Sequence, residues 1–397
     1  MKRVAVTGIG VVSALGTNAG QFWESLAAGR SGIRPIESLD VTRFKIQNGA
    51  EAKAFDPLAH LDAKSSAMLD RSTQMASAAA EEAITESGLR VSGDRTAVVT
   101  GCSVGGKISE DEAYRRLYSE GRERFEPMTI PRVMANASAS WISMRHRITG
   151  PCYTVSTACA SAAHAIGQAF WLVRNGIVEA AVTGGTEAPF TPGLLRGWEA
   201  MRVVSSTTCR PFSKDRDGLI LGEGAAMFVL ELLESAQARG AKIYAEICGF
   251  GMTSDAGHLT MPSAIGAAAA MRSALADGLL DPGDIGYINA HGTGTEANDR
   301  TEAHAIRSVF SQPPPVSSTK SAHGHALGAS PALEAAATIF ALHYGMLPPT
   351  ANFTTRDPEC DLEVIVDRPR SLKVKAAISN SFAFGGLNAV LAFRAAQ

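Results

Sequence analysis

Cys159 is the first residue whose type and position point to chemistry. It stands where a β-prone run, residues 155–157, gives way to an alanine-rich run, residues 160–173, that is apolar on nearly every side. The second run predicts a buried helix, and Asn175 and Gly176 supply its stop. A helix N-terminus offers unpaired N–H groups and the positive end of a dipole, so this position favours a reactive thiolate. An inert core cysteine is the competing interpretation, because free cysteines are usually buried.

Three further groups of polar and glycine residues each follow a β-prone run. They are His291 after residues 285–290, residues 320–325 after residues 316–319, and residues 384–386 after residues 376–379. In open α/β sheets, sites form where the C-terminal ends of strands meet loops, so we expect these groups to meet Cys159. A thiol, two imidazoles that can donate to a developing oxyanion and glycine-flanked backbone N–H groups suit acyl transfer. His291 or His325 alone would more often be structural.

Other residues in these loops have competing interpretations. His323 and His325 could ligate zinc, but no third ligand stands at convincing spacing, so we predict no metal. Residues 299–302 match a capping box, which would assign the Glu302 carboxylate to a helix start. Thr293 and Thr295 alternate in a loop where they could cap turns or hydrogen-bond a polar ligand arm. Gly385 and Gly386 allow a ligand to approach the backbone closely.

The elements that must position these residues alternate between strand and helix patterns. Strand-like runs at residues 4–7, 96–100 and 180–183 end near glycines, which predicts an α/β fold with largely buried strands. An amphipathic helix is expected over residues 70–87, and residues 121–130 are charged and irregular like an excursion. We interpret Gly8-Ile9-Gly10 as a strand entering a glycine-rich loop. It lacks the third glycine of a dinucleotide site.

The chain divides into two halves of similar design. We place the boundary between residues 239 and 240, so that residues 1–239 carry Cys159 and residues 240–397 carry both histidines. The second half restarts with a strand at residues 243–248 that enters Gly249-Phe250-Gly251, which echoes the opening of the first half. The pattern suggests one βα unit used twice.

Composition excludes several classes of protein. The 397 residues carry a formal net charge of −2, which argues against a general nucleic-acid binder. The six cysteines show no CxxC pair or regular spacing, which is typical of a reducing compartment. No apolar run reaches the roughly 18 residues of a membrane span. The start resembles a signal peptide, but Gly8 and Gly10 interrupt it and no cleavage site follows, so we expect a cytoplasmic protein.

The motifs together resemble the β-ketoacyl-[acyl carrier protein] synthases of the thiolase superfamily, of the elongating (KAS I/II) type. The resemblance runs almost end to end, in the family's order. The motifs are VTGIG at residues 6–10, TACAS at 157–161, RPFSKDRDG at 210–218, GEGA at 222–225, HGTGT at 291–295, KS at 320–321 with GH at 324–325, and NSF at 380–382 with FGG at 384–386.

This resemblance implies a duplicated, five-layered αβαβα fold that dimerises through its N-terminal half. It implies that Cys159 accepts an acyl chain from an acyl carrier protein and that malonyl carrier protein then loses carbon dioxide. The resulting carbanion attacks the Cys159 thioester and gives a 3-oxoacyl carrier protein, the elongation step of fatty-acid synthesis. His291 and His325 would hold the malonyl thioester oxygen, so at least one imidazole must present an N–H there.

The resemblance also implies supporting roles. The backbone N–H groups of Cys159 and Phe384 match the oxyanion hole, and Phe384 also matches the gate of the acyl pocket. The remaining positions are Lys320 and Glu302 with electrostatic and structural roles, Thr293 and Thr295 on the pantetheine arm, and Val104, Phe384 and Gly385 as substrate-binding residues. No free cofactor is implied.

Some positions depart from the family's fatty-acid members. Only Lys64 remains of the basic residues that precede the first long helix, and Lys107 replaces an apolar pocket residue. Ala383 occupies a position where these members carry glycine, and Leu387 replaces a small polar residue. A ketosynthase of a specialised polyketide, polyene or modified-lipid pathway is therefore an alternative, acting as a homodimer or as a heterodimer with a chain-length factor.

Two relatives of different function fit less well. A thiolase would need a second cysteine where residues 380–382 read Asn-Ser-Phe. A non-catalytic chain-length factor lacks the nucleophilic cysteine, which is present here as Cys159.

Overall fold

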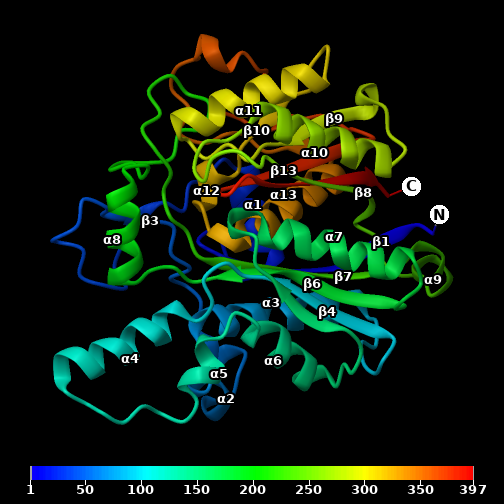
Figure 1. The fold of residues 1–397 in the computed structure, drawn as a ribbon. Helices are drawn as coiled ribbons and strands as arrows, with labels where there is room; N and C mark the ends of the chain where they lie inside the picture. Colours follow the sequence, from blue (N-terminus) through cyan, green and yellow to red (C-terminus); the bar gives the residue numbers. More distant parts are fainter. Residues whose placement is uncertain (1, 397) are drawn as a thin grey trace.

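The computed structural model describes residues 2–396. Its main sheet has ten strands in the order β10-β9-β13-β14-β8-β1-β7-β6-β4-β5 (Figure 1). The first half of the chain supplies β1 (Val4–Ser13), β4 (Thr96–Gly101), β5 (Cys152–Val155), β6 (Ala180–Glu187) and β7 (Gly224–Leu232). The second half supplies β8 (Ala245–Ser254), β9 (Ile285–Asn289), β10 (Val316–Ser317), β13 (Ala376–Ala383) and β14 (Leu387–Ala395). The pairs β2 (Arg34–Pro35) with β3 (Asn48–Gly49) and β11 (Met346–Leu347) with β12 (Arg370–Ser371) form small separate sheets.

The two halves of the sheet have the same topology. Within the first half the order is β5-β4-β6-β7-β1, and within the second it is β10-β9-β13-β14-β8. The parallel pairs β4–β5 and β4–β6 correspond to β9–β10 and β9–β13, and the antiparallel pairs correspond likewise. The halves join where β1 pairs antiparallel with β8. The strand order therefore shows the duplication that the sequence suggested. The predicted boundary at residues 239 and 240 lies in the connection between α9 (Leu233–Ala238) and β8.

Helices cover both outer faces of the bent sheet and fill the space between its halves (Figure 1). Helices α3 (Arg71–Ser87) and α6 (Ala137–His146) pack on the first half, and α10 (Ala264–Asp277) packs on the second with α11 (Glu296–Val309) against it. Between the halves lie α7 (Ser161–Arg174) and α13 (Ser330–Tyr344), which contact each other. The arrangement is αβαβα, as predicted. The alanine-rich run after Cys159 forms the expected buried helix.

The glycines of the two predicted glycine-rich loops lie inside strands instead. Gly8 and Gly10 belong to β1, and Gly249 and Gly251 belong to β8. A Cβ on Gly8 or Gly10 would overlap backbone carbonyl oxygens of α3, and one on Gly249 or Gly251 would overlap those of α10. The prediction of loops was wrong because the glycine pattern reflects close helix–strand packing, for which only glycine leaves room.

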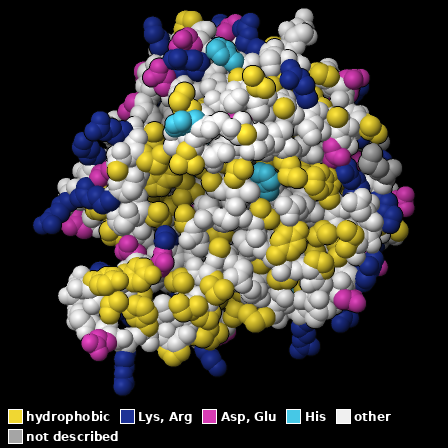
Figure 2. Space-filling view, in the orientation of Figure 1, with side chains coloured by type: hydrophobic (Ala, Val, Ile, Leu, Met, Phe, Trp, Pro, Cys, Tyr) yellow, Lys and Arg dark blue, Asp and Glu magenta, His cyan; other side chains and the backbone are white. Residues whose placement is uncertain are grey.

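Other helices complete the fold. They are α1 (Ala19–Ala27), α2 (Ala63–Ala67), α4 (Lys107–Glu120), α5 (Thr129–Val133), α8 (Pro192–Met201) and α12 (Lys320–His323). The irregular residues after α4 correspond to the predicted excursion at residues 121–130, of which the last two begin α5. Apolar side chains gather over the α4–α6 region (Figure 2). The exposed apolar side chains there are Tyr114, Tyr118, Phe125, Met128, Ile130, Met134 and Met144. Across residues 2–396, no helix has the length and hydrophobicity needed to cross a bilayer.

Candidate active site

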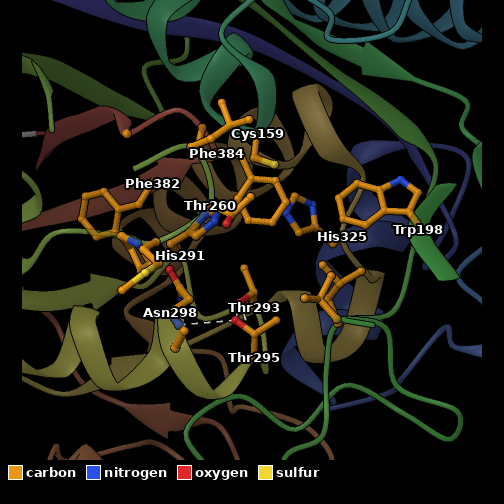
Figure 3. Close-up of a pocket in the computed structure, with 18 residues that line it drawn as sticks. Cys159, Trp198, Thr260, His291, Thr293, Thr295, Asn298, His325, Phe382 and Phe384 are labelled. Atoms are coloured by element: carbon orange, nitrogen blue, oxygen red, sulfur yellow. Dashed lines mark hydrogen bonds between the residues drawn. The ribbon is translucent and has the colours of Figure 1, made fainter. Parts of the chain in front are cut away.

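One cavity brings the predicted chemistry together (Figure 3). It contains about 640 Å³ of space that no atom fills, its open mouth included. Its lining includes the predicted residues Cys159, His291, His325, Thr293, Thr295 and Phe384. These residues follow the C-terminal ends of β5, β9, β10 and β13, so the expected convergence of four strand ends is present.

Cys159 lies in a 3₁₀ turn, Ala158–Ala160, between β5 and α7, and its exposed fraction is only 7%. Ala158 has φ of 48°, a left-handed conformation that is uncommon for residues other than glycine. Burial raises the pKa of the Cys159 thiol to about 11, although Lys320 and a backbone hydrogen bond from Phe384 lower it. The expectation that this position favours the thiolate is therefore wrong, because the desolvation of a buried anion outweighs the favourable charges nearby.

Phe384 lies directly after β13, which extends to Ala383. The strand expected at residues 376–379 is therefore longer than the sequence predicted and includes residues 380–383. The loop itself is the glycine turn, in which Gly385 has φ of 84° and its N–H donates to the Leu259 carbonyl at 2.7 Å. The ring of Phe384 stacks on Trp198, with 6.1 Å between ring centres.

The hydrogen bonds of His325 fix its tautomer. Its Nδ1 lies 3.0 Å from the Leu327 backbone N–H and 3.1 Å from Ser330 Oγ. A backbone N–H can only donate, so Nδ1 accepts and the ring proton of the neutral imidazole resides on Nε2. Burial and the nearby Lys320 hold the pKa of His325 well below its usual value. His325 is therefore a neutral N–H donor at the cavity.

Lys320 holds His291 in the same form, a neutral imidazole with its proton on Nε2. The Lys320 Nζ lies 3.2 Å from His291 Nδ1 and 2.7 Å from the His291 carbonyl, and it forms a buried ion pair with Glu334. An ammonium group has only donors, so His291 Nδ1 accepts and Nε2 carries the proton. Burial and Lys320 also hold the pKa of His291 well below its usual value. The two rings lie 5.7 Å apart, nearly perpendicular to each other.

Glu302 anchors the backbone of the His291 loop. Its carboxylate accepts from His291 N at 2.8 Å, Gly292 N at 2.7 Å and Asn380 Nδ2 at 3.0 Å. Helix α11 begins earlier than predicted, at Glu296, and Thr295 is its N-cap. The capping-box interpretation of Glu302 was wrong, because the carboxylate reaches back across the loop. Burial raises the pKa of Glu302 to about 7 against these three donors.

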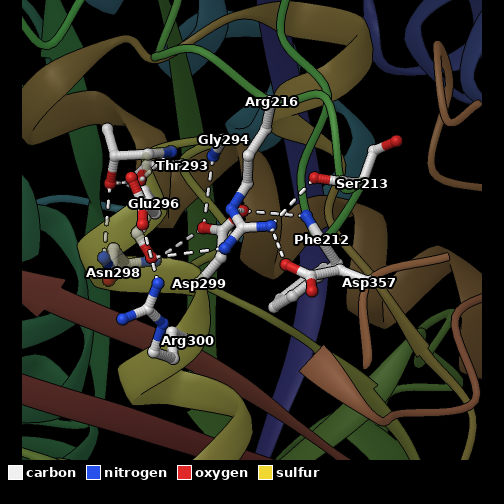
Figure 4. A network of polar contacts seen from close by, with 12 residues as sticks. Phe212, Ser213, Arg216, Thr293, Gly294, Glu296, Asn298, Asp299, Arg300 and Asp357 are labelled. Carbon is white, nitrogen blue, oxygen red and sulfur yellow. Dashed lines mark hydrogen bonds and ion pairs between the residues drawn. The ribbon is translucent and has the colours of Figure 1, made fainter. Parts of the chain in front are cut away.

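A second carboxylate, Asp299, holds the threonine part of the same loop (Figure 4). It accepts from Gly294 N at 3.2 Å and from Phe212 N at 2.8 Å. The buried Arg216 guanidinium lies between Asp299 and Asp357, so the segment of residues 210–218 packs behind the loop. Thr293 Oγ1 and Thr295 Oγ1 are 2.8 Å apart and face the cavity.

Val104 packs in an apolar cluster with Leu327 and with Leu219, a residue that lines the cavity, and does not itself line it. Its backbone N–H donates to Glu187, a buried carboxylate that also accepts from Ser103 N and from Gly328 N of the loop after His325. No motif in the sequence pointed to Glu187, Glu334, Trp198 or residues 259–262. The one signal for Glu334 was a lone charge within an alanine-rich apolar run.

No set of three or more metal-ligating side chains comes together anywhere in residues 2–396. His323, which the sequence raised as a ligand, uses both ring nitrogens within the protein. Its Nδ1 lies 2.8 Å from the Gly324 carbonyl and its Nε2 lies 3.0 Å from Thr319 Oγ1.

The sequence matches the profile of the β-ketoacyl synthase N-terminal domain over residues 1–236 and that of the C-terminal domain over residues 244–354. The chain therefore belongs to the β-ketoacyl synthase family, which consists of condensing acyltransferases with a thiolase-like fold. It is 46% identical over 400 residues to Nodulation protein E of a Rhizobium species, with 99% of both chains covered. It is 42% identical over 411 residues to 3-oxoacyl-[acyl-carrier-protein] synthase 2 of a Synechocystis species, with 100% of this chain and 99% of that protein covered. Among solved structures, the ishigamide ketosynthase/chain length factor superposes with a TM-score of 0.96 and 36% identity, covering 100% of both chains.

Proposed function

We propose that this chain joins a Cys159-bound acyl chain to malonyl-[acyl carrier protein] by decarboxylative Claisen condensation and releases 3-oxoacyl-[acyl carrier protein]. The observation that carries the proposal is the pair of neutral imidazoles in the cavity of Cys159. Their Nδ1 atoms are engaged by the protein, so both have an Nε2–H available for one substrate oxygen.

In the first step, Cys159 attacks the carbonyl carbon of an acyl thioester. The new C–S bond forms as the bond to the pantetheine sulfur breaks, and the thiol proton passes to the departing sulfur. Negative charge develops on the carbonyl oxygen, where the backbone N–H groups of Cys159 and Phe384 stabilise it. The hydrogen bond from Phe384 N toward the thiol supports this assignment. The thiol pKa of about 11 implies that deprotonation accompanies attack.

In the second step, the thioester oxygen of malonyl carrier protein accepts from His291 and His325. The carbon–carbon bond to the carboxylate breaks and carbon dioxide leaves. The electron pair of that bond stays with the remaining acyl group, which becomes an enolate. The enolate carbon attacks the Cys159 thioester, and the cysteine sulfur leaves and takes up a proton. Donors that are already oriented stabilise the enolate without the cost of rearranging solvent.

The other predicted residues take supporting roles. Lys320 and Glu302 act electrostatically and structurally, since Lys320 fixes the His291 tautomer and Glu302 anchors its backbone. Thr293 and Thr295 contact the pantetheine arm, and Val104 and Gly385 shape the substrate path beside Phe384. The chemistry uses no free cofactor, because both substrates arrive on carrier-protein phosphopantetheine.

The acyl carrier protein is the proposed substrate partner, and a second ketosynthase-like chain is the proposed structural partner. Two features of the N-terminal half support such an interface: the exposed apolar side chains of the α4–α6 region and the edge strand β5 with its exposed Cys152. All six cysteines are free thiols, which supports the predicted cytoplasmic location.

Acylation and decarboxylation can be tested separately. Incubation with octanoyl-[acyl carrier protein] should add one octanoyl mass to the peptide that contains Cys159, and Cys159→Ala should abolish it. Malonyl-[acyl carrier protein] should release carbon dioxide, more slowly by orders of magnitude in His291→Ala or His325→Ala. These histidine variants should still be acylated. Acylation that survives Cys159→Ala would contradict the nucleophile.

A second candidate is a ketosynthase of a specialised polyketide, polyene or modified-lipid pathway that pairs with a chain-length factor. Lys107 favours it, since this residue at the start of α4 pairs with Glu110 where fatty-acid members carry an apolar residue. The similarity to the ishigamide ketosynthase/chain length factor adds support. Turnover of saturated and unsaturated acyl carrier proteins by this chain alone would distinguish the candidates. A requirement for a second, different chain would favour the specialised enzyme.

A further inference from the structure

Two side chains from the first turn of α7 hold the turn that carries Cys159. Thr157 N donates to Ser161 Oγ at 2.9 Å, and Ser161 Oγ donates to the Ala158 carbonyl at 2.6 Å. Ser161 is fully buried, and its two bonds close around the left-handed Ala158. Such a conformation costs about 1–3 kcal/mol and persists only where the surroundings impose it.

The second side chain is His164. Its Nδ1 lies 3.1 Å from the Ala160 carbonyl and 2.9 Å from Thr157 Oγ1. A carbonyl oxygen only accepts, so Nδ1 carries the ring proton. Burial lowers the pKa of His164, which leaves the ring neutral with that single proton. The ring is oriented by an edge-on contact with Phe250, with 6.0 Å between ring centres.

The contacts of His164 flank the nucleophile on both sides. Thr157 lies two residues before Cys159, and Ala160 is the next residue after it. A rotation of the intervening peptide groups would move the Cys159 thiol and its backbone N–H together. We infer that His164 is a positioning residue for acyl transfer, because its Nδ1–H keeps the strained turn in the geometry that the acylation step needs. The inference rests on the proposed function, since it concerns that function's first step.

The position of His164 makes this role separable from condensation. Both imidazole donors belong to the second half of the chain and take their orientation from Lys320, Leu327 and Ser330. His164 belongs to α7 of the first half. Its loss should therefore slow acyl transfer while malonyl decarboxylation continues. A displacement of about 1 Å at reacting atoms can cost about 10²-fold in rate.

The test compares His164→Leu with His164→Asn. Leucine removes the donor, whereas the asparagine amide can place an N–H near the Nδ1 position. We expect His164→Leu to lower the rate of octanoyl transfer from octanoyl-[acyl carrier protein] to Cys159 by about 10- to 100-fold. His164→Asn should recover most of that rate, and carbon dioxide release from malonyl-[acyl carrier protein] should match the wild type in both. Gln168→Leu, one turn further along α7, is the matched control and should change neither rate.

A second measurement distinguishes an effect on the backbone N–H of Cys159 from an effect on its thiol. Iodoacetamide alkylates a thiol without an oxyanion, so its rate at Cys159 should fall much less than the acyl-transfer rate in His164→Leu. Thr157→Val should also slow acyl transfer, and its effect should not add to that of His164→Leu if both act through one hydrogen bond.

Several results would overturn the inference. They are equal slowing of both half-reactions in His164→Leu, equal rates for the leucine and asparagine variants, and additive effects of Thr157→Val and His164→Leu. If His164→Leu does not fold, the asparagine and valine variants carry the test. Failure of the wild-type protein to be acylated at Cys159 would refute the proposed function instead.

Discussion

The tautomer of His325 predicts that two substitutions at this position rank in opposite order for stability and for activity. The structure assigns Nδ1 to the Leu327 N–H and leaves Nε2–H for the substrate. An asparagine side chain reaches the Nδ1 position, and a glutamine side chain extends to the Nε2 position. His325→Asn should therefore keep the buried acceptor and lose the catalytic donor. His325→Gln should do the reverse.

The magnitudes follow from the two hydrogen bonds. Loss of one oxyanion donor costs about 10²–10³ in rate, so decarboxylation by His325→Asn should fall by that factor. His325→Gln should retain more activity than the asparagine variant. It leaves the buried Leu327 N–H without its acceptor, which costs about 1–3 kcal/mol of unfolding free energy.

The assay pairs carbon dioxide release from malonyl-[acyl carrier protein] with unfolding in urea. We expect activity to decrease from wild type to His325→Gln to His325→Asn. Stability should decrease from wild type to His325→Asn to His325→Gln. Acylation of Cys159 in both variants serves as the control for an intact first step. Faster decarboxylation by His325→Asn than by His325→Gln would refute the assignment of the proton to Nε2.

Four further outcomes are expected. Lys320→Met leaves the Glu334 carboxylate buried and unpaired, so urea unfolding should show a loss of about 3–5 kcal/mol, and adding Glu334→Gln should restore most of it. Because both imidazoles have pKa values held well below the usual value of about 6.5, they should remain neutral donors from about pH 8 to about pH 6. Decarboxylation should not rise as the pH falls through that window, and a rise would indicate imidazolium donors. A fall in rate below about pH 7 would report protonation of Glu302, which anchors the His291 loop. Burial raises the pKa of Cys159, so iodoacetamide alkylation should still be accelerating with pH above pH 9, and a plateau below that pH would contradict the buried thiol. Arg216→Met should raise the KM for carrier-protein substrates more than it lowers kcat, since Arg216 supports the threonine loop through Asp299.

The sequence was sufficient to predict which residues meet. Each group follows a β-prone run, and parallel strands bring their C-terminal ends to one edge of a sheet. The meeting of His291, His325 and Phe384, which follow parallel strands of the second half, could therefore be predicted without coordinates, as could the buried helix after Cys159. Cys159 follows β5 at the opposite end of the sheet, so its approach to them depends on how the two halves pack.

Properties that depend on distant contacts could not be predicted. The role of Glu302 depends on a loop that folds back over the helix start, whereas the local pattern alone matched a capping box. The thiol pKa of Cys159 depends on burial by both halves, and the local helix terminus indicated the opposite direction. The tautomers of the two imidazoles depend on Leu327 and Lys320, which only the fold brings into place.

The glycines of β1 and β8 have a consequence for mutational scanning. At Gly8, Gly10, Gly249 and Gly251 even an alanine methyl group would meet a helix backbone, so every substitution forces a helix away from the sheet. None of the four lines the cavity of Cys159. In a scan scored by activity alone, these positions would be as intolerant as the nucleophile. A parallel score of cellular abundance would separate them, because variants at Cys159 should accumulate as folded protein and variants at the four glycines should not.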